Sequence, residues 1–187
     1  MGRGQQTLRI IGGQWRGRKF QFPPVENLRP TPDRVRETLF NWLMPYIEGA
    51  RCLDLFCGSG ALGLEALSRG ASEVSFVDTS NQVIRFLKET TAKLGCEQAH
   101  FFHGSAKDFL KKTLSPYDII FLDPPYDLNL IPDTAEQLQA TGGLKPGCWI
   151  YLEHDGRLDL NRLPNTWQLH REKVAGQVHY ALYQHTS

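Results

Sequence analysis

The sequence of 187 residues has no long apolar run, no paired cysteine motif and no marked excess of either charge. No apolar stretch approaches the roughly 20 residues of a membrane-spanning helix, and the opening segment MGRGQQTLRI lacks the apolar core of a secretory signal. Cys52, Cys57, Cys96 and Cys148 form no CxxC pair and have no metal-ligand spacing. We therefore expect reduced, mostly buried thiols in a cytoplasmic protein with no metal and no membrane partner.

The net charge of +1 by itself says nothing about binding partners, but the charge is unevenly distributed along the chain. Residues 1–36 contain eight Lys or Arg residues and two acidic residues, a net charge of +6, whereas the remainder carries −5. A basic segment on a mildly acidic body indicates a polyanionic partner. A solvated, flexible arm explains the charge equally well.

The first 47 residues predict a small extension. Residues 8–22 alternate short β-prone pieces around glycines, which is typical of a hairpin. Thr31 followed by Pro32 predicts a helix start, with Thr31 as the N-cap and Pro32 as the first helical residue. Apolar residues at helical spacing follow at Val35, Leu39, Trp42, Leu43 and Tyr46. We expect residues 1–47 to form this extension and residues 48–187 to form the main domain.

From residue 51 onward, strands and helices alternate. The predicted strands are 51–56, 73–78, 99–104, 117–123 and 148–154, and the predicted helices are 60–70, 80–95, 106–113 and 131–141. This alternation predicts an α/β fold with a doubly wound, mostly parallel sheet. Two long strands about Ala175 and Gly176, in residues 166–184, add a C-terminal antiparallel hairpin.

A glycine-rich loop follows the first strand of the main domain. In DLFCGSGALG, Gly58, Gly60 and Gly63 match G-x-G-x-x-G, a ligand-binding turn at a helix N-terminus. Asp54 beside this loop would repel a pyrophosphate, but it suits a ligand with an ammonium or sulfonium group. S-adenosylmethionine has both groups, and its ribose diol could donate to Asp78 at the end of the next strand. A helix-capping or buried-network role for Asp54 and a simple turn role for Asp78 remain open.

The stretch DIIFLDPPYD ends a strand with a carboxylate, two prolines and an aromatic ring. The exocyclic amine of a nucleobase is a poor nucleophile, and two fixed acceptors for its hydrogens would aim its lone pair at a methyl donor. The Asp123 carboxylate and the Pro124 carbonyl fit this role, and Pro125 stiffens the backbone between them and Tyr126. Tyr126 offers a face on which a flipped base can stack. The alternative is an ordinary strand-ending turn.

Residues 51–187 resemble the class I S-adenosylmethionine-dependent methyltransferases, and the Asp-Pro-Pro-Tyr tetrad resembles the (Asp/Asn)-Pro-Pro-(aromatic) motif of amino-group methyltransferases. The resemblance implies a seven-stranded Rossmann-like sheet whose antiparallel seventh strand lies in the terminal hairpin. It also implies a methionyl site at residues 54–60, a ribose site at Asp78 and an adenine site at Ser105 and Ala106, although family members often carry Asp or Asn where Ser105 stands. The implied cofactor contacts are Asp54, Phe56, Gly58, Ser59, Gly60, Asp78, Ser105 and Ala106.

Three further stretches, LRIIGGQWRGRKF, LRPTPDRVRETLFNWL and LHREKVAGQVHYALYQ, extend the likeness over nearly the whole chain. Together with DLFCGSGALGLEALSRGA and DPPY they resemble the bacterial ribosomal RNA small subunit methyltransferase D family. This resemblance implies methyl transfer to the N2 amine of one guanine in 16S rRNA of the small ribosomal subunit. The basic extension would then meet phosphates, and the candidate RNA contacts are Arg16, Arg18, Lys19, Arg34 and Arg36.

Other functions remain as alternatives. A DNA adenine-N6 or cytosine-N4 methyltransferase shares the tetrad, but such enzymes usually carry a sizeable target-recognition domain. An NAD-binding oxidoreductase would explain the glycines but not Asp54 or the tetrad. A non-catalytic RNA-binding protein with this fold would not need the acceptor geometry. We expect a monomer.

Overall fold

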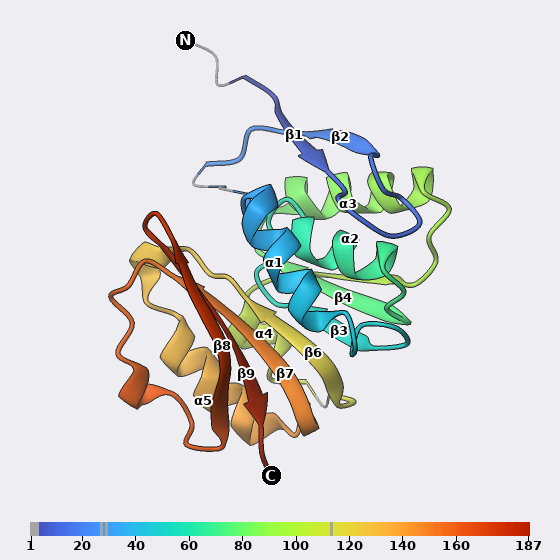
Figure 1. The fold of residues 1–187 in the computed structure, drawn as a ribbon. Coiled ribbons are helices and arrows are strands. Elements are labelled where there is room, and N and C mark those ends of the chain that lie inside the picture. Colours follow the sequence, from blue (N-terminus) through green and yellow to red (C-terminus); the bar gives the residue numbers. More distant parts are fainter. Residues whose placement is uncertain (1–3, 27, 29, 113) are drawn as a thin grey trace.

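The computed structural model describes residues 4–26, 28, 30–112 and 114–187. Its centre is a seven-stranded sheet in the order β5-β4-β3-β6-β7-β9-β8 (Figure 1). The first five strands in this order are parallel, and β9 pairs antiparallel with both β7 and β8. The strands are β3 (Arg51–Asp54), β4 (Glu73–Asp78), β5 (Ala99–His103), β6 (Tyr117–Leu122), β7 (Leu144–His154), β8 (Trp167–Ala175) and β9 (Val178–His185). The predicted sheet and its C-terminal hairpin are confirmed.

Helices cover both faces of the sheet (Figure 1). One face carries α1 (Asp33–Leu43), α2 (Ala61–Ser68) and α3 (Asn81–Lys93), and the other carries α4 (Ala106–Phe109) and α5 (Ile131–Thr141). Alternate residues of a strand point to opposite faces, so Ile119 and Phe121 pack with α1–α3 while Ile120 and Leu122 pack with α4 and α5. Two short 3₁₀ helices, η1 (Tyr126–Leu128) and η2 (Leu160–Arg162), lie in the loops after β6 and β7.

A local sequence signal sets the start of α3. The Val83 N–H donates to the Ser80 hydroxyl at 3.3 Å, which confirms the predicted N-cap of α3. Helix α5 covers the predicted residues, whereas α4 ends at Phe109, short of the predicted 106–113, of which Thr113 lies outside the described residues. All four cysteines are free, and all but the half-buried Cys96 are buried. No helix in the described part of the chain is both long and apolar enough to cross a membrane.

The N-terminal extension contains the predicted hairpin, formed by β1 (Gln6–Arg9) and β2 (Lys19–Phe22). The hairpin lies beside α2 and α3 (Figure 1), and Leu8 and Phe22 belong to the same hydrophobic cluster as α1–α3. Glu65 of α2 is fully buried and accepts the backbone N–H groups of Ile11 (3.0 Å) and Gly12 (2.8 Å). The extension therefore shares its core with the sheet instead of hanging from it as an arm.

Arg36 completes this anchor. Its side chain is 2% exposed, and its guanidinium donates to the Arg9 carbonyl (2.8 Å), to the Thr31 carbonyl (3.3 Å) and to Glu65 (3.4 Å). It also forms an ion pair with Asp33. The prediction that Arg36 contacts RNA is wrong for this structure, because its buried guanidinium forms its hydrogen bonds and ion pairs with groups of the protein itself. Arg34, by contrast, is exposed.

The start of α1 also differs from the prediction. The helix begins at Asp33 with Pro32 at the N-cap position and no side-chain cap, so the prediction of Thr31 as N-cap is wrong. Thr31 is 4% exposed, and its hydroxyl oxygen lies 3.1 Å from Asp123 Oδ2 and 3.3 Å from Glu153 Oε2. Carboxyl groups are stronger hydrogen-bond partners than the backbone N–H of a helix end. Tertiary contacts therefore override the local capping signal.

The buried anchor generates a prediction about stability. Arg36→Met keeps the aliphatic stem but leaves Glu65 with less compensation for its charge, so the free energy of unfolding should fall by about 3 kcal/mol. Arg34→Met on the same helix is the matched control and should change it by no more than about 0.5 kcal/mol. Urea unfolding at neutral pH measures both. Equal stabilities of the two variants would contradict the anchoring role.

Candidate functional site

Three strand ends gather their carboxyl groups at one rim of the sheet. Asp54 ends β3, Asp78 ends β4 and Asp123 directly follows β6. Strands β4 and β6 flank β3 on its two sides, and the chain order of the sheet reverses between β3 and β6. The carboxyl ends of strands at such a switch point form the crevice where open α/β sheets bind ligands. The structure therefore brings the glycine loop, Asp78 and the Asp-Pro-Pro-Tyr tetrad to one place.

Neighbouring side chains approach the backbone of the glycine loop too closely for larger residues to fit. Gly60 is the N-cap of α2 with φ of +79°, and a Cβ there would lie 2.2 Å from Leu87 Cδ2. At Gly63 a Cβ would lie 2.2 Å from Phe76 Cε1, because α2 packs directly on β4. The second and third glycines of the motif are thus required by backbone conformation and by helix–sheet packing.

Asp54 lies beneath this loop. It is 1% exposed, and its Oδ2 accepts the Gly63 N–H at 3.0 Å. Burial raises the pKa of Asp54 to about 7, and the negative charge of Asp78 acts in the same direction, although the hydrogen bond from Gly63 opposes them. This placement matches the buried-network alternative for Asp54, so its influence on a ligand acts through its charge and through the loop that it holds.

Asp78 is half-buried and organises the other side of the loop. Its two oxygens accept the N–H groups of Gly58 and Ser80, each at 2.9 Å. A carboxylate offers about four lone-pair sites, so the side chain keeps acceptor capacity for hydroxyl groups of a ligand.

The remaining predicted cofactor contacts lie around the same rim. Phe56 is half-buried, and Ser59 is buried with its hydroxyl accepting the Ala61 N–H at 3.4 Å. The Ser105 hydroxyl accepts the Asp108 N–H at 3.0 Å and so caps α4, whose first residue, Ala106, is buried. Ser105 therefore has a structural role in this protein as the N-cap of α4.

The tetrad continues β6 into the rim. Asp123 is half-buried, Pro124 is buried and Pro125 is exposed. Tyr126 is half-buried, and its hydroxyl donates to Glu153 Oε1 at 2.9 Å. β7 runs parallel to β6 with Phe121 opposite Tyr151 and Leu122 opposite Leu152, so this register brings Asp123 to the level of Glu153.

Glu153 and Thr31 are site residues that the sequence predictions missed. Glu153 is 4% exposed and also accepts the Tyr151 hydroxyl, at 2.9 Å, besides its contacts with Tyr126 and Thr31. One signal was available: a glutamate ends the apolar run CWIYLE as an aspartate ends DIIFLD. The signal for Thr31 was absent, because its partners are 92 and 122 residues away.

The two carboxyl groups influence one another's protonation. Burial raises the pKa of Asp123 well above its ordinary value, and the neighbouring negative charge of Glu153 raises it further. Burial also raises the pKa of Glu153, while the hydroxyls of Tyr151, Tyr126 and Thr31 lower it. Each carboxyl group therefore disfavours ionisation of the other.

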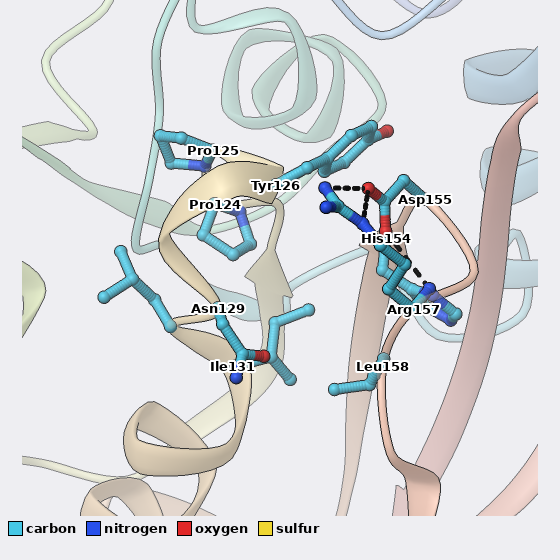
Figure 2. A pocket seen from close by; sticks show the side chains of 10 residues that line it. Pro124, Pro125, Tyr126, Asn129, Ile131, His154, Asp155, Arg157 and Leu158 are labelled. Carbon is cyan, nitrogen blue, oxygen red and sulfur yellow. Dashed lines mark hydrogen bonds and ion pairs between the residues drawn. The ribbon is translucent and has the colours of Figure 1, made fainter.

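A cavity of about 240 Å³ opens beside the tetrad. The loop after β6 forms one side and the loop after β7 the other, with the Tyr126 ring directed toward the second loop (Figure 2). Arg157 is ion-paired with Asp155 at its edge, and Asn129 has a positive φ of 46°. The lining residues are Pro124, Pro125, Tyr126, Asn129, Leu130, Ile131, His154, Asp155, Arg157 and Leu158.

Comparisons with known proteins agree over almost the whole chain. The family model described as "Conserved hypothetical protein 95" matches residues 8–184. Ribosomal RNA small subunit methyltransferase D of Escherichia coli (strain K12) is 49% identical over 181 residues, covering 97% of this chain and 91% of that protein. Its counterpart in Haemophilus influenzae is 47% identical, covering 95% and 93%. The solved structure "Putative methyltransferase yhhF" from E. coli superposes with a TM-score of 0.88 at 47% identity, covering 97% and 99%.

The buried Asp54 predicts a pH-dependent stability. Its folded pKa of about 7 lies above the unfolded value of about 3.9, so its contribution to stability is complete below pH 4 and is lost as the pH rises toward 7. Asp54→Asn should therefore gain about 3 kcal/mol relative to the wild type between pH 5 and pH 8. Denaturant unfolding at several pH values measures this, with the exposed Asp133→Asn as control. Parallel curves for Asp54→Asn and the wild type would contradict it.

Proposed function

The chain belongs to the ribosomal RNA small subunit methyltransferase D family, and on that premise we propose that it methylates the exocyclic N2 amine of a guanine in 16S rRNA. S-adenosylmethionine is the methyl donor. The observation that carries the proposal is the position of the Asp-Pro-Pro-Tyr tetrad at the switch point, next to the glycine loop.

The tetrad supplies two acceptors for an amino group. Asp123 is half-buried at the strand end, and the carbonyl of Pro124 follows it on a backbone that two prolines stiffen. Hydrogen bonds from both amine hydrogens to these acceptors draw the nitrogen toward tetrahedral geometry and orient its lone pair. This arrangement supports methylation of an amine.

The rim also fits a cationic ligand. Asp54, Asp78, Asp123 and Glu153 bring carboxyl groups to it, a setting that favours a sulfonium and an ammonium and repels a pyrophosphate. Asp78 keeps acceptor capacity for ribose hydroxyls, and the loop at residues 54–60 would hold the methionyl part. When bound, the cofactor supplies an electrophilic methyl group on a positively charged sulfur. The same rim argues against an NAD-dependent oxidoreductase.

The cavity beside the tetrad suits a planar base removed from its stack. The Tyr126 ring offers a stacking face, and Asn129 and His154 offer hydrogen-bonding groups within reach of a base edge. Pro124, whose carbonyl is one of the two proposed acceptors, lines this cavity, and Asp123 directly precedes it in the chain.

The N-terminal extension would bring the RNA to this rim. Arg16, Arg18, Lys19 and Arg34 are exposed, in contrast to Arg36. The same segment reaches the site, because Leu28 Cδ1 lies 2.7 Å from where a Gly58 Cβ would stand and Thr31 contacts Asp123. Phosphate contacts on the extension would thus position the strand that carries the target guanine.

The decisive experiment is methyl transfer from tritiated S-adenosylmethionine to small ribosomal subunits that lack the modification. Digestion of the 16S rRNA to nucleosides should give one equivalent of N2-methylguanosine, and fragment mapping should place it at one nucleotide. Naked 16S rRNA and duplex DNA are offered in parallel. Label in duplex DNA alone, or in a base other than guanine, would overturn the proposal.

Removing the acceptor at Asp123 should abolish transfer without abolishing cofactor binding. Asp123→Ala should lower kcat by at least about 10²-fold, because one of the two acceptors is lost. The dissociation constant for S-adenosylmethionine, measured by calorimetry, should stay within about threefold. Glu136→Ala, at an exposed position of α5, is the control. A folded Asp123→Ala variant that loses cofactor binding would refute the role assigned to Asp123.

The exposed cationic side chains of the extension should strengthen binding to small subunits through electrostatic contacts with RNA phosphates. The combined variant Arg16→Ala/Arg18→Ala/Lys19→Ala should bind subunits more weakly and reduce the slope of log affinity against log salt by about 2 to 3. Lys93→Ala/Lys111→Ala/Lys112→Ala removes the same charge from exposed positions outside the extension. Filter binding across a salt series compares the two. An unchanged slope in the first variant would contradict phosphate contact by the hairpin.

A further inference from the structure

Glu153, Thr31 and Asp123 form a continuous hydrogen-bonded chain that leads away from the reacting amine. Methyl transfer to an amine leaves its nitrogen with one proton too many, and the two acceptors of the tetrad do not by themselves dispose of it. We propose that Glu153 receives this proton from Asp123 through the hydroxyl of Thr31. The inference rests on the proposed function and extends it by assigning a destination to the proton.

The geometry permits the relay. The two carboxyl groups are also within hydrogen-bonding reach of each other, so the Thr31 variants below decide whether the proton passes through the hydroxyl. Thr31 Oγ1 lies 3.1 Å from Asp123 Oδ2 and 3.3 Å from Glu153 Oε2, on one side chain that is almost fully buried. A hydroxyl carries one hydrogen and two lone pairs. It can accept a hydrogen from a protonated Asp123 while it donates its own to Glu153, and it can reverse both bonds.

The surroundings decide which carboxyl is ionised at the start. Tyr126 and Tyr151 each donate a hydroxyl to Glu153 at 2.9 Å, in addition to Thr31. Three donors stabilise a negative charge on Glu153, so the single shared proton resides on Asp123 Oδ2. Asp123 Oδ1 then remains a neutral acceptor for the amine.

Other charged and titratable groups face this pair from the neighbouring elements. Asp54 of β3 adds negative charge that favours protonation of Asp123, and Tyr180 of β9 pairs with Glu153 across the strands. Arg36 of α1 donates to the Thr31 carbonyl and neutralises Glu65 and Asp33. Asp155, two residues beyond Glu153, is ion-paired with Arg157. Negative charge thus dominates around the pair and favours retention of the shared proton.

The step balances without any further reactant. As the methyl carbon passes from sulfur to the amine nitrogen, an N–H hydrogen moves to Asp123 Oδ1. The hydrogen on Asp123 Oδ2 moves to Thr31 Oγ1, and the Thr31 hydroxyl hydrogen moves to Glu153 Oε2. The positive charge of the methyl donor and the negative charge of Glu153 disappear together. A buried site therefore never has to hold an isolated charge.

Four variants test the relay on the full chain with small subunits as substrate. Glu153→Gln and the near-isosteric Thr31→Val should each lower kcat about 10²-fold, with the KM for S-adenosylmethionine within about threefold. Thr31→Ser restores the hydroxyl and should recover kcat to within about threefold. Thr91→Val removes a buried hydroxyl that bonds to Leu87 of α3, outside the site, and should behave as the wild type.

The pH profile separates a relay from mere support of the fold. In the wild type, kcat should fall as the pH is lowered through the pKa of Glu153, because a protonated Glu153 cannot accept the proton that the amine releases. The residual activity of Glu153→Gln should lack this acidic limb. Tyr151→Phe removes one donor from Glu153 and should move the limb to higher pH.

A readout without substrate or cofactor completes the test. Carboxyl ¹³C NMR of the free protein should show Asp123 titrating above its ordinary range in the wild type and returning toward that range in Glu153→Gln. The resonance of Asp133, at an exposed position of α5, should be the same in both proteins and serves as an internal control.

The outcomes distinguish the inference from the proposed function. Wild-type protein that labels no guanine in small subunits refutes the proposed function, whatever the NMR titration gives. Active wild type together with a Glu153→Gln variant that keeps its kcat and acidic limb refutes the relay alone. The same holds if Thr31→Val and Thr31→Ser have equal kcat, and these variants decide the matter should Glu153→Gln fail to fold.

Discussion

The pairing of β3 with β6 decides where the chemistry of this protein takes place. Because β4 lies on the other side of β3, the chain order reverses at β3. The neighbouring strands β4, β3 and β6 therefore place the polar residues at their carboxyl ends in one crevice. The glycine loop follows β3, and Asp78 ends β4, where its side chain accepts the Gly58 N–H. Asp123 follows β6. A cofactor site and an acceptor site thus become neighbours as a consequence of strand order alone.

The N-terminal extension depends on that sheet and completes the site in return. Glu65 of α2 binds the hairpin through Ile11 and Gly12, and it binds α1 through Arg36. These contacts fix the segment that ends at Thr31, whose hydroxyl reaches Asp123 and Glu153. The part of the chain proposed to meet RNA is therefore in direct contact with the groups proposed to receive the amine and its proton. Displacement of the extension would disturb both functions.

The features that could be predicted from the sequence are those that depend on residues close to one another along the chain. Short runs of β-prone apolar residues indicated the strands, Ser80 marked the start of α3, and the DPPY tetrad marked the rim. The features it missed depend on pairs far apart in sequence. Arg36 looks like any surface cation on a helix until Glu65, 29 residues later, is seen beneath it. Thr31 carries a good local capping signal, which two distant carboxyls outweigh, and Glu153 matters only because β7 lies beside β6 in a fixed register.

The carboxyl pair also bears on the choice between aspartate and asparagine in tetrads of this type. A buried pair of like charges is unfavourable for folding, and such arrangements are concentrated at functional sites. If Asp123 holds the shared proton, it presents a neutral oxygen to the amine, as an asparagine amide would. The two residues are then equivalent as acceptors during methyl transfer and differ only in how the released proton is handled. An asparagine cannot pass a proton onward, whereas Asp123, joined to Glu153 through Thr31, can.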